Sequence, residues 1–462
     1  MTGAALVVRS RRVVTPAGVR PARIVVRDGR IVAVEPHGPG RADRRPAEPR
    51  LPEHDFGDRV ILPGLVDTHV HVNEPGRTHW EGFASGTRAA VLGGITTLVD
   101  MPLNSDPPTT TVEALERKRE AAAGTAVVDV GAWAGLVPES VDRIEALAGA
   151  GALGFKAFLV DSGIPEFPPV DEPVLRAAMP AIAALGLPLL VHAESPGPIA
   201  GAAASVAGAD PRRHAVWEAS RPVAAEVEAI DLLARLAGDT GCRVHVVHVS
   251  SAAAAARLAR ARAEGAPLGG ETCPHYLIWC GAEIEEGATV FKCAPPIRGS
   301  DDREALWRAL ETGVLDLVAS DHSPTPPDLK RLDTGDFFGA WGGIASLGLA
   351  LPALWAAASA RGISIERLAR WLSSAPAALA GLAEKGEIRT GGDADLVVFD
   401  PEPERVLAAA DLRFRHAVSP YVGARVRGRV EAVFLRGALR VSGAAPVEGE
   451  RGRWIEKGGR VA

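Results

Sequence analysis

The chain has 462 residues, of which 47% are hydrophobic and 23% are charged, and its formal net charge is −6. This balance is typical of a globular protein and argues against a disordered, coiled-coil or collagen-like chain. The acidic surplus argues against a nucleic-acid binder, and no apolar run reaches the roughly 18 residues of a membrane-spanning helix. The N-terminus lacks the pattern of a signal peptide.

The cysteines indicate the redox environment of the protein, and the few lysines point to positions of interest. The four cysteines, Cys242, Cys273, Cys280 and Cys293, form no CxxC pair and are too few for a disulfide framework. They therefore predict a reducing, cytoplasmic environment. Of the 51 basic residues only six are lysines, so a lysine inside an apolar segment stands out.

The first part of the chain is predicted to be β-structure. Arg23–Val34 contains two β-branched runs joined by Asp28-Gly29, a dipeptide that suits a type I′ hairpin because both residues need a positive φ. Residues 36–58 are rich in Pro, Arg, Asp and Glu and are predicted to form a surface loop.

The middle of the chain alternates short apolar strands with Ala- and Leu-rich helices such as Val112–Ala123 and Ala224–Leu236. Such alternation predicts parallel strands with crossover helices, and eight units favour an α/β fold of the closed (β/α)₈ TIM barrel type over residues 61–385. The predicted strands are Leu65–Val72, Thr97–Met101, Val127–Trp133, Gly154–Leu159, Leu189–Ala193, Val244–Val249, Leu268–Thr272 and Leu315–Ala319.

The last part of the chain returns to β-structure. Asp395–Phe399 and Ala424–Val441 are rich in strand formers, with Arg436-Gly437 as a second hairpin turn. We expect residues 1–60 and 386–462 to join in one small β-sandwich domain beside the barrel.

Polar residues gather where the predicted barrel strands end. The catalytic groups of such barrels come from the carboxyl ends of several strands, so these side chains are expected to converge. They are Asp67, His69 and His71 on the first strand, Lys156 on the fourth, His192 and Glu194 on the fifth, His245 and His248 on the sixth, and Asp321 and His322 on the eighth.

His69 and His71 lie two residues apart, which places both imidazoles on one face of a strand. If that face is the barrel interior, the pair has the geometry of metal ligands. A lone HxH pair is more often a chance surface feature. The histidines and the aspartate at the other strand ends favour the metal site.

Lys156 lies inside Gly154-Phe-Lys-Ala-Phe-Leu159, where a lone ammonium group would be costly to bury. One account is a salt bridge to a neighbouring carboxylate. The other is that CO₂ converts the amine to a carbamate whose oxygens bridge two cations. The second account is favoured, because a guanidinium cannot form this carbamate and the chain otherwise prefers Arg.

Two cations that share one oxygen lie roughly 3.5–4 Å apart and lower the pKa of a bound water to about 7. Asp321 can bind one cation and also take the proton from the attacking water. His245 is three residues from His248 and is expected to face the opposite side, under a helix. His322 is expected to face away from the metals, and His275 either lines the site or is structural.

Together these motifs are typical of one known enzyme superfamily. The chain resembles the amidohydrolase superfamily of binuclear-metal hydrolases, in its cyclic-amidase branch, over almost its full length, and within that branch it most resembles the allantoinases. The long first motif, Gly64–Phe83, carries most of this similarity. The further matching segments are Met101–Asn104, Gly154–Phe158, Val191–Glu194, Glu271–Leu277, Lys292–Arg298, Ser320–Pro324 and Ala340–Ile344.

The resemblance implies a role for each ligand. His69 and His71 hold the more buried metal together with Asp321, His192 and His248 hold the second metal, and N6-carboxylated Lys156 bridges the two. Asp321 acts as the general base. The metals are expected to be zinc, although Co²⁺, Mn²⁺ or Ni²⁺ could serve, and CO₂ or bicarbonate is needed for the carbamate. The resemblance also implies a homotetramer acting on a small molecule, with no nucleic-acid or membrane partner.

The implied reaction is hydrolysis of the hydantoin ring of allantoin to allantoate. Dihydroorotases typically have Arg where this chain has Asn73, and an amide suits a neutral ring without a carboxylate. Asn73, Asn104 and Cys293 are the predicted substrate contacts, although a buried cysteine is usually only a small hydrophobic residue. The alternatives are a hydantoinase or dihydropyrimidinase, a dihydroorotase-like enzyme, and a non-catalytic relative, against which the complete ligand set argues.

Overall fold

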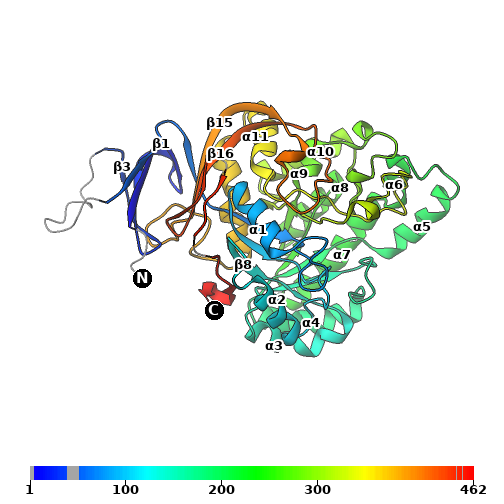
Figure 1. Ribbon diagram of the computed structural model, residues 1–462. Coiled ribbons are helices and arrows are strands. Elements are labelled where there is room, and N and C mark those ends of the chain that lie inside the picture. The colour runs from blue at the N-terminus through cyan, green and yellow to red at the C-terminus, as the bar shows by residue number, and fades with distance from the viewer. Residues whose placement is uncertain (1–4, 39–50, 444, 450, 462) are drawn as a thin grey trace.

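The computed structural model describes residues 5–38, 51–443, 445–449 and 451–461. Strands from both ends of the chain share one nine-stranded sheet, in the order β18-β17-β16-β15-β5-β1-β2-β3, with β4 also paired to β1. Figure 1 shows β1, β3, β15 and β16 together on one side of the molecule and most of the helices on the other. The strands are β1 Leu6–Thr15, β2 Gly18–Arg27, β3 Arg30–Pro36, β4 Glu53–Asp55, β5 Val60–Pro63, β15 Leu396–Val406, β16 Arg425–Leu435, β17 Ala438–Ser442 and β18 Ala445–Pro446. The predicted domain boundaries at residues 60 and 385 stay a prediction.

Both predicted hairpins are confirmed. Asp28 and Gly29 have φ values of 51° and 78° between β2 and β3, and Arg436 and Gly437 have 47° and 74° between β16 and β17. Positive φ at both central residues is the geometry that a two-residue hairpin turn requires.

The predicted loop over residues 36–58 is partly wrong. Residues 39–50 lie outside the described residues, but β4 forms within the rest and pairs in parallel with β1. The acidic residues that suggested a loop are bound to one arginine: Arg9 lies 2.8 Å from both Glu53 and Asp55. Neutralised charge therefore lets a polar segment add a strand to the sheet.

The barrel strands confirm the predicted fold class. Val70 pairs in parallel with His322 and closes the ring between the first and last strands. The strands are β6 Leu65–Val70, β7 Ile95–Asp100, β8 Asp129–Ala132 continued by β9 Ala134–Gly135, β10 Phe155–Phe158, β11 Leu189–His192, β12 Val244–Val246, β13 Leu268–Thr272 and β14 Leu317–Val318.

Helices surround this ring, and those predicted over Val112–Ala123 and Ala224–Leu236 are present as α2 and α7. Their ends follow local chemistry: the Thr111 side chain accepts from Ala114 N at the start of α2, and α7 stops at Gly241, whose φ is 70°. The helices are α1 Phe83–Leu92, α2 Val112–Ala122, α3 Ile144–Gly149, α4 Glu172–Ala184, α5 Pro196–Val206, α6 His214–Ser220, α7 Val223–Thr240, α8 Ala252–Ala263, α9 Pro274–Ile278, α10 Ser300–Glu311, α11 Ala350–Ala360, α12 Ile365–Ala369 and α13 Ala375–Leu379.

Short helical turns and one further strand pair complete the described elements. They are η1 Pro138–Arg143, η2 Gly281–Glu283, η3 Thr289–Phe291, η4 Pro327–Lys330, η5 Arg370–Ser374, η6 Ala409–Asp411, η7 Lys457–Gly459, β19 Ile455–Glu456 and β20 Arg460–Val461. Among the helices described, none combines the length and apolar character that crossing a bilayer requires.

A buried ionic cluster joins the barrel to the sheet. Lys385 Nζ lies 2.6 Å from Asp129 on β8, 2.8 Å from Asp393 and 2.7 Å from Asp395, which precedes β15. Arg436, from the β16–β17 turn, also contacts Asp129. The carboxylates, Asp395 and Asp129 foremost, outweigh burial and raise the pKa of Lys385, so its charge is retained.

Candidate metal centre

A cavity of about 300 Å³ opens at the carboxyl ends of the barrel strands. The histidines predicted as ligands line it together with Asp321, and these are His69, His71, His192 and His248. Lys156 is fully buried and does not line the cavity. Residues that are far apart in the sequence therefore meet at one end of the barrel.

Local backbone geometry directs these side chains. The alternation along β6 places His69 and His71 on one face, as the spacing predicts. His248 and Asp321 follow the ends of β12 and β14 with φ values of 42° and 45°. A non-glycine residue in this left-handed region is uncommon, and such residues cluster at functional sites.

The same turn explains why the prediction for His245 is wrong. His245 does not face away from the other interior side chains; its Nε2 lies 3.1 Å from Glu271 Oε2. Glu271 also binds the ligand His69, so His245 belongs to the same interior network. The left-handed backbone at His248 breaks the strand alternation on which the prediction depended.

His69, His71 and Asp321 form the first candidate ligand group. Asp321 Oδ1 lies 3.2 Å from His69 Nε2 and 3.6 Å from His71 Nε2. The three side chains offer ligand atoms within 4.8 Å of one another. Two imidazole nitrogens and a carboxylate oxygen suit a transition-metal cation such as Zn²⁺.

His192 and His248 form the second candidate ligand group beside the first. Their ring centroids are 4.6 Å apart, and the His248 ring lies 5.6 Å from that of His69. Nδ1 of His248 is buried and has no hydrogen-bond partner in the described part of the chain. A buried polar atom without a partner is costly and suggests a missing ligand.

Lys156 is a second buried polar group without a hydrogen-bond partner among the described residues. Its Nζ is buried, has no hydrogen-bond partner among the residues described, and lies 4.7 Å from the Phe158 ring centroid. Burial lowers the pKa of Lys156 to about 7, against the opposing charges of Glu271 and Asp321. The salt bridge considered from the sequence is absent here, and a neutral amine is the form that reacts with CO₂.

The charge states suit cation binding. Burial lowers the pKa values of His71, His192 and His248, which favours neutral imidazoles. Burial would raise the pKa of Asp321, but the nearby histidines, His69 foremost, lower it below its ordinary value. A carboxylate among unprotonated imidazoles is therefore ready to bind a cation.

Two buried glutamates orient the ligand histidines. His69 Nδ1 lies 2.6 Å from Glu271 Oε1, and His192 Nε2 lies 2.7 Å from Glu194 Oε2. If each histidine donates through this nitrogen, Nε2 of His69 and Nδ1 of His192 keep their lone pairs for a cation. Sequence reasoning noted both glutamates within motifs but assigned them no role.

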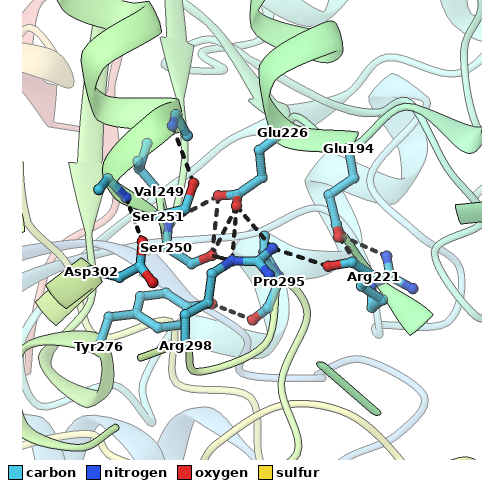
Figure 2. A network of polar contacts seen from close by, with 12 residues as sticks. Glu194, Arg221, Glu226, Val249, Ser250, Ser251, Tyr276, Pro295, Arg298 and Asp302 are labelled. Atoms are coloured by element: carbon cyan, nitrogen blue, oxygen red, sulfur yellow. Dashed lines mark hydrogen bonds and ion pairs between the residues drawn. The ribbon is translucent and has the colours of Figure 1, made fainter. Parts of the chain in front are cut away.

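Glu194 belongs to a larger buried network, shown in Figure 2. Arg221 Nε lies 3.0 Å from Glu194 Oε1, and Arg298 donates to the Arg221 backbone oxygen at 3.1 Å and to Glu226 at 2.9 Å. Glu226 also accepts from Ser250 N at 3.0 Å, two residues after His248. Both ligands of the second group are thus supported by one network.

The predicted substrate contacts lie in different places. Asn104 lines the cavity, whereas Asn73 and Cys293 do not. Asn73 is buried with a φ of 67°, its Nδ2 is 3.4 Å from Pro324 O, and its Oδ1 has no partner in the described chain. Cys293 is buried, and its backbone oxygen accepts from Trp217 Nε1 at 3.0 Å.

His275 lies close to the ligands. Its ring, Cys273 and Asp321 offer potential ligand atoms within 4.8 Å of one another. Both His275 ring nitrogens are buried without a hydrogen-bond partner among the described residues, and burial lowers its pKa to about 4. Of the two readings left open from sequence, this placement favours a role at the site.

The cavity walls are polar and aromatic. Beyond the ligands, they include Arg221, Lys292, Asp161, Trp217 and Trp341. Trp217 has the Lys292 ammonium 4.4 Å and the Arg221 guanidinium carbon 5.6 Å from its ring centroid. Lys292 and Trp341 fall within matching segments of the sequence. Arg221, Asp161 and Trp217 were assigned no role from the sequence, because they lie outside the predicted strand ends.

Comparisons with known proteins agree with this geometry. Residues 60–440 match the model of the Amidohydrolase family. The chain is 50% identical to the allantoinase of Streptomyces avermitilis over 437 residues, covering 95% of each protein. It is 42% identical to the allantoinase of Arabidopsis thaliana, covering 94% of this chain and 87% of the relative.

Solved structures give a similar result for the fold. The L-hydantoinase (dihydropyrimidinase) of Arthrobacter aurescens superimposes with a TM-score of 0.92 and 30% identity, over 99% of this chain and all of that one. The dihydropyrimidinase of Brevibacillus agri gives a TM-score of 0.87 and 28% identity, over 98% and 99% of the two chains.

Proposed function

The chain belongs to the amidohydrolase family, and on that premise we propose that it is a metal-dependent hydrolase that opens the hydantoin ring of allantoin to give allantoate. The observation that carries the proposal is the convergence of four histidines, Asp321 and an unpartnered lysine at one end of the barrel. The similarity to allantoinases over nearly the whole chain supports the choice of substrate.

The proposed metal assignment follows the two ligand groups. His69, His71 and Asp321 would hold one cation, His192 and His248 would hold the second, and Lys156, carboxylated at Nζ, would supply further oxygen ligands. Zn²⁺ suits this set of nitrogen and oxygen donors, while Co²⁺, Mn²⁺ and Ni²⁺ bind similar sets. When bound, two such cations polarise the ring carbonyl and lower the pKa of water to about 7.

The chain's own residues then move the proton. Asp321, ionised and lining the cavity, accepts the proton of the attacking water on a carboxylate oxygen. It returns that proton to the ring nitrogen as the carbon–nitrogen bond breaks, so the product has a new carboxylate and a free ureide nitrogen. Asn104, which lines the cavity, is the proposed hydrogen-bond partner of the ureide.

A second candidate is hydantoinase or dihydropyrimidinase activity, which the structural similarity to those enzymes favours. A hydantoinase acting on apolar hydantoins would need an apolar wall for the ring substituent. The walls here combine the aromatic Trp217 and Trp341 with the polar Asn104 and Asp161, which offer hydrogen bonds to the ureido group of allantoin.

A substrate panel tests the proposal. Metal-loaded protein is incubated at pH ~7.5, a choice set by a water pKa of about 7, with allantoin, dihydroorotate, dihydrouracil and hydantoin. A Lys156→Ala protein serves as the blank. The proposal expects allantoin to turn over well above the others, and only in the wild type. Faster turnover of dihydrouracil or hydantoin would move the enzyme to the second candidate.

A further inference from the structure

Two buried lysines beside the cavity have no carboxylate partner among the residues that the structure describes. Lys292, which follows η3, and Lys330, the last residue of η4, are 7% and 2% exposed. Neither forms a salt bridge within 4.0 Å in the part of the chain that the structure describes. In the ionic cluster at the barrel–sheet junction, by contrast, three carboxylates surround the Lys385 ammonium.

Both ammonium groups bind backbone oxygens of one loop instead. Lys292 Nζ donates to Phe338 O at 3.2 Å and to Ala340 O at 2.5 Å. Lys330 Nζ donates to Trp341 O at 3.1 Å and also to Gly343 O. Four of the six carbonyl groups in residues 338–343 are therefore held by two side chains.

The main chain around each lysine reinforces this hold. Gly343 N donates to Lys292 O at 2.9 Å, and Trp341 N donates to Leu329 O at 2.7 Å. Lysine suits the task because its compact ammonium group has three rotatable donors, whereas the planar guanidinium fork of arginine matches carboxylates. This explains why a chain with 45 arginines uses lysine at both positions.

The loop forms part of the cavity wall. Ala340, Trp341, Gly342 and Gly343 line the cavity, as Lys292 itself does. The reacting amide must lie at the floor, beside the ligands. A substituent on the ring must then extend along the walls, of which this loop is one.

We propose that Lys292 and Lys330 are positioning residues that hold residues 338–343 as a wall of the substrate cavity, and that this wall, separately from the metal centre, selects the polar ureido substituent of the cyclic amide substrate. This inference rests on the proposed function for the identity of the substrate. The part that concerns the loop does not depend on it.

The test compares the wild type with Lys330→Met and Lys292→Met, which keep the length of the side chain but remove its donors. Lys457→Met is the matched control, because Lys457 also donates to a backbone oxygen, that of Leu185 at 2.9 Å, but does not line the cavity. Three quantities are measured: metal content, hydrogen exchange over residues 336–345, and kcat and KM for allantoin and unsubstituted hydantoin.

We expect both cavity variants to retain the wild-type metal content and to exchange faster over residues 336–345. KM for allantoin should rise about tenfold, the effect of losing one or two net hydrogen bonds, with kcat changing much less. KM for hydantoin, which has no substituent to place, should change by less than about threefold on the same reasoning. The control should match the wild type throughout.

Unchanged exchange and an unchanged KM in Lys330→Met would overturn the proposal, and so would loss of metal together with activity. If Lys330→Met does not fold, the proposal is tested with Lys292→Met, whose position is less buried. The same measurements and the same outcomes then apply to that variant. If the wild type fails to hydrolyse allantoin, the proposed function fails, and hydrogen exchange with metal content still decides whether the lysines hold the loop.

Discussion

At the barrel–sheet junction Lys385 contacts three carboxylates, whereas at the carboxyl ends of the barrel strands Lys156 is at least as deeply buried and has no hydrogen-bond partner among the described residues. The first ammonium group is neutralised by the chain itself. Near the second, Nδ1 of His248 and both ring nitrogens of His275 also lack hydrogen-bond partners in the described part of the chain. Buried polar groups in folded proteins are normally satisfied, so the incomplete region is where ligands from outside the chain are expected.

The comparison predicts opposite consequences for matched substitutions. Changes at the incomplete region should abolish chemistry and leave the fold intact. Changes in the ionic cluster should destabilise the fold and leave the chemistry of the folded molecules intact.

The largest expected effect is on Asp321. Asp321→Asn keeps the size of the side chain but removes the group that accepts the proton, so kcat should fall by a factor of about 10² to 10⁴. Asp316→Asn is the control, because Asp316 precedes the same strand at its other end and pairs with Arg262 at 3.1 Å. Steady-state rates and thermal unfolding are measured for both. Equal rates for Asp321→Asn and the wild type would contradict the assignment.

The next largest effect is expected for a substitution in the ionic cluster around Lys385. Lys385→Met leaves Asp129, Asp393 and Asp395 buried without their shared cation, so the free energy of unfolding should fall by about 3–5 kcal/mol. Denaturant unfolding measures this loss. The rate per folded molecule, measured below the unfolding transition, should match the wild type. A folded variant with normal stability but no activity would reverse the roles of the two regions.

His214 is a buried histidine that lacks hydrogen-bond partners among the described residues but lies outside the cavity. It begins α6, both its ring nitrogens lack hydrogen-bond partners among the described residues, and its ring packs edge-on against Phe337 at 5.5 Å. Burial, assisted by the charge of Arg298, lowers its pKa to about 4. It does not line the cavity. An unpartnered histidine is therefore not by itself a ligand.

The pH dependence of stability follows from this lowered pKa. Because unfolded His214 binds a proton with its ordinary pKa of 6.5 and the folded protein resists doing so, the free energy of unfolding should fall as the pH drops from about 6.5 towards 4. In His214→Phe this contribution, up to about 3 kcal/mol, should be absent. Denaturant titrations of both proteins across this range measure the difference. Parallel stability curves would show that His214 does not titrate in this way.

Much of the architecture could be predicted from the sequence because its signals are local. Alternating apolar runs predicted each barrel strand, and Asp28-Gly29 and Arg436-Gly437 predicted both hairpins. The spacing of His69 and His71 depends only on strand periodicity. Residues 53–55 were assigned to a loop because their pairing depends on Arg9, which is distant in the sequence.

The surroundings of the site could be predicted only in part. The left-handed backbone at His248 could not be predicted, because no glycine marks this position in the sequence. It is this backbone conformation that allows His245 and His248 to face the same side. Glu271 and Glu194 act through contacts that form only when the barrel closes. Lys292 and Lys330 stood out by residue type alone, and no sequence pattern connects them to the carbonyl groups of residues 338–343.

The central claim is that the unpartnered groups at the carboxyl ends of the strands are completed by metal ions and a carboxylated lysine. The most direct test is the metal content of wild-type protein and of Lys156→Met, both prepared with Zn²⁺ and bicarbonate and analysed by mass spectrometry. The account predicts two ions per chain in the wild type and loss of metal in the folded variant. Equal metal content in the two proteins, or a wild type that hydrolyses allantoin without bound metal, would contradict it.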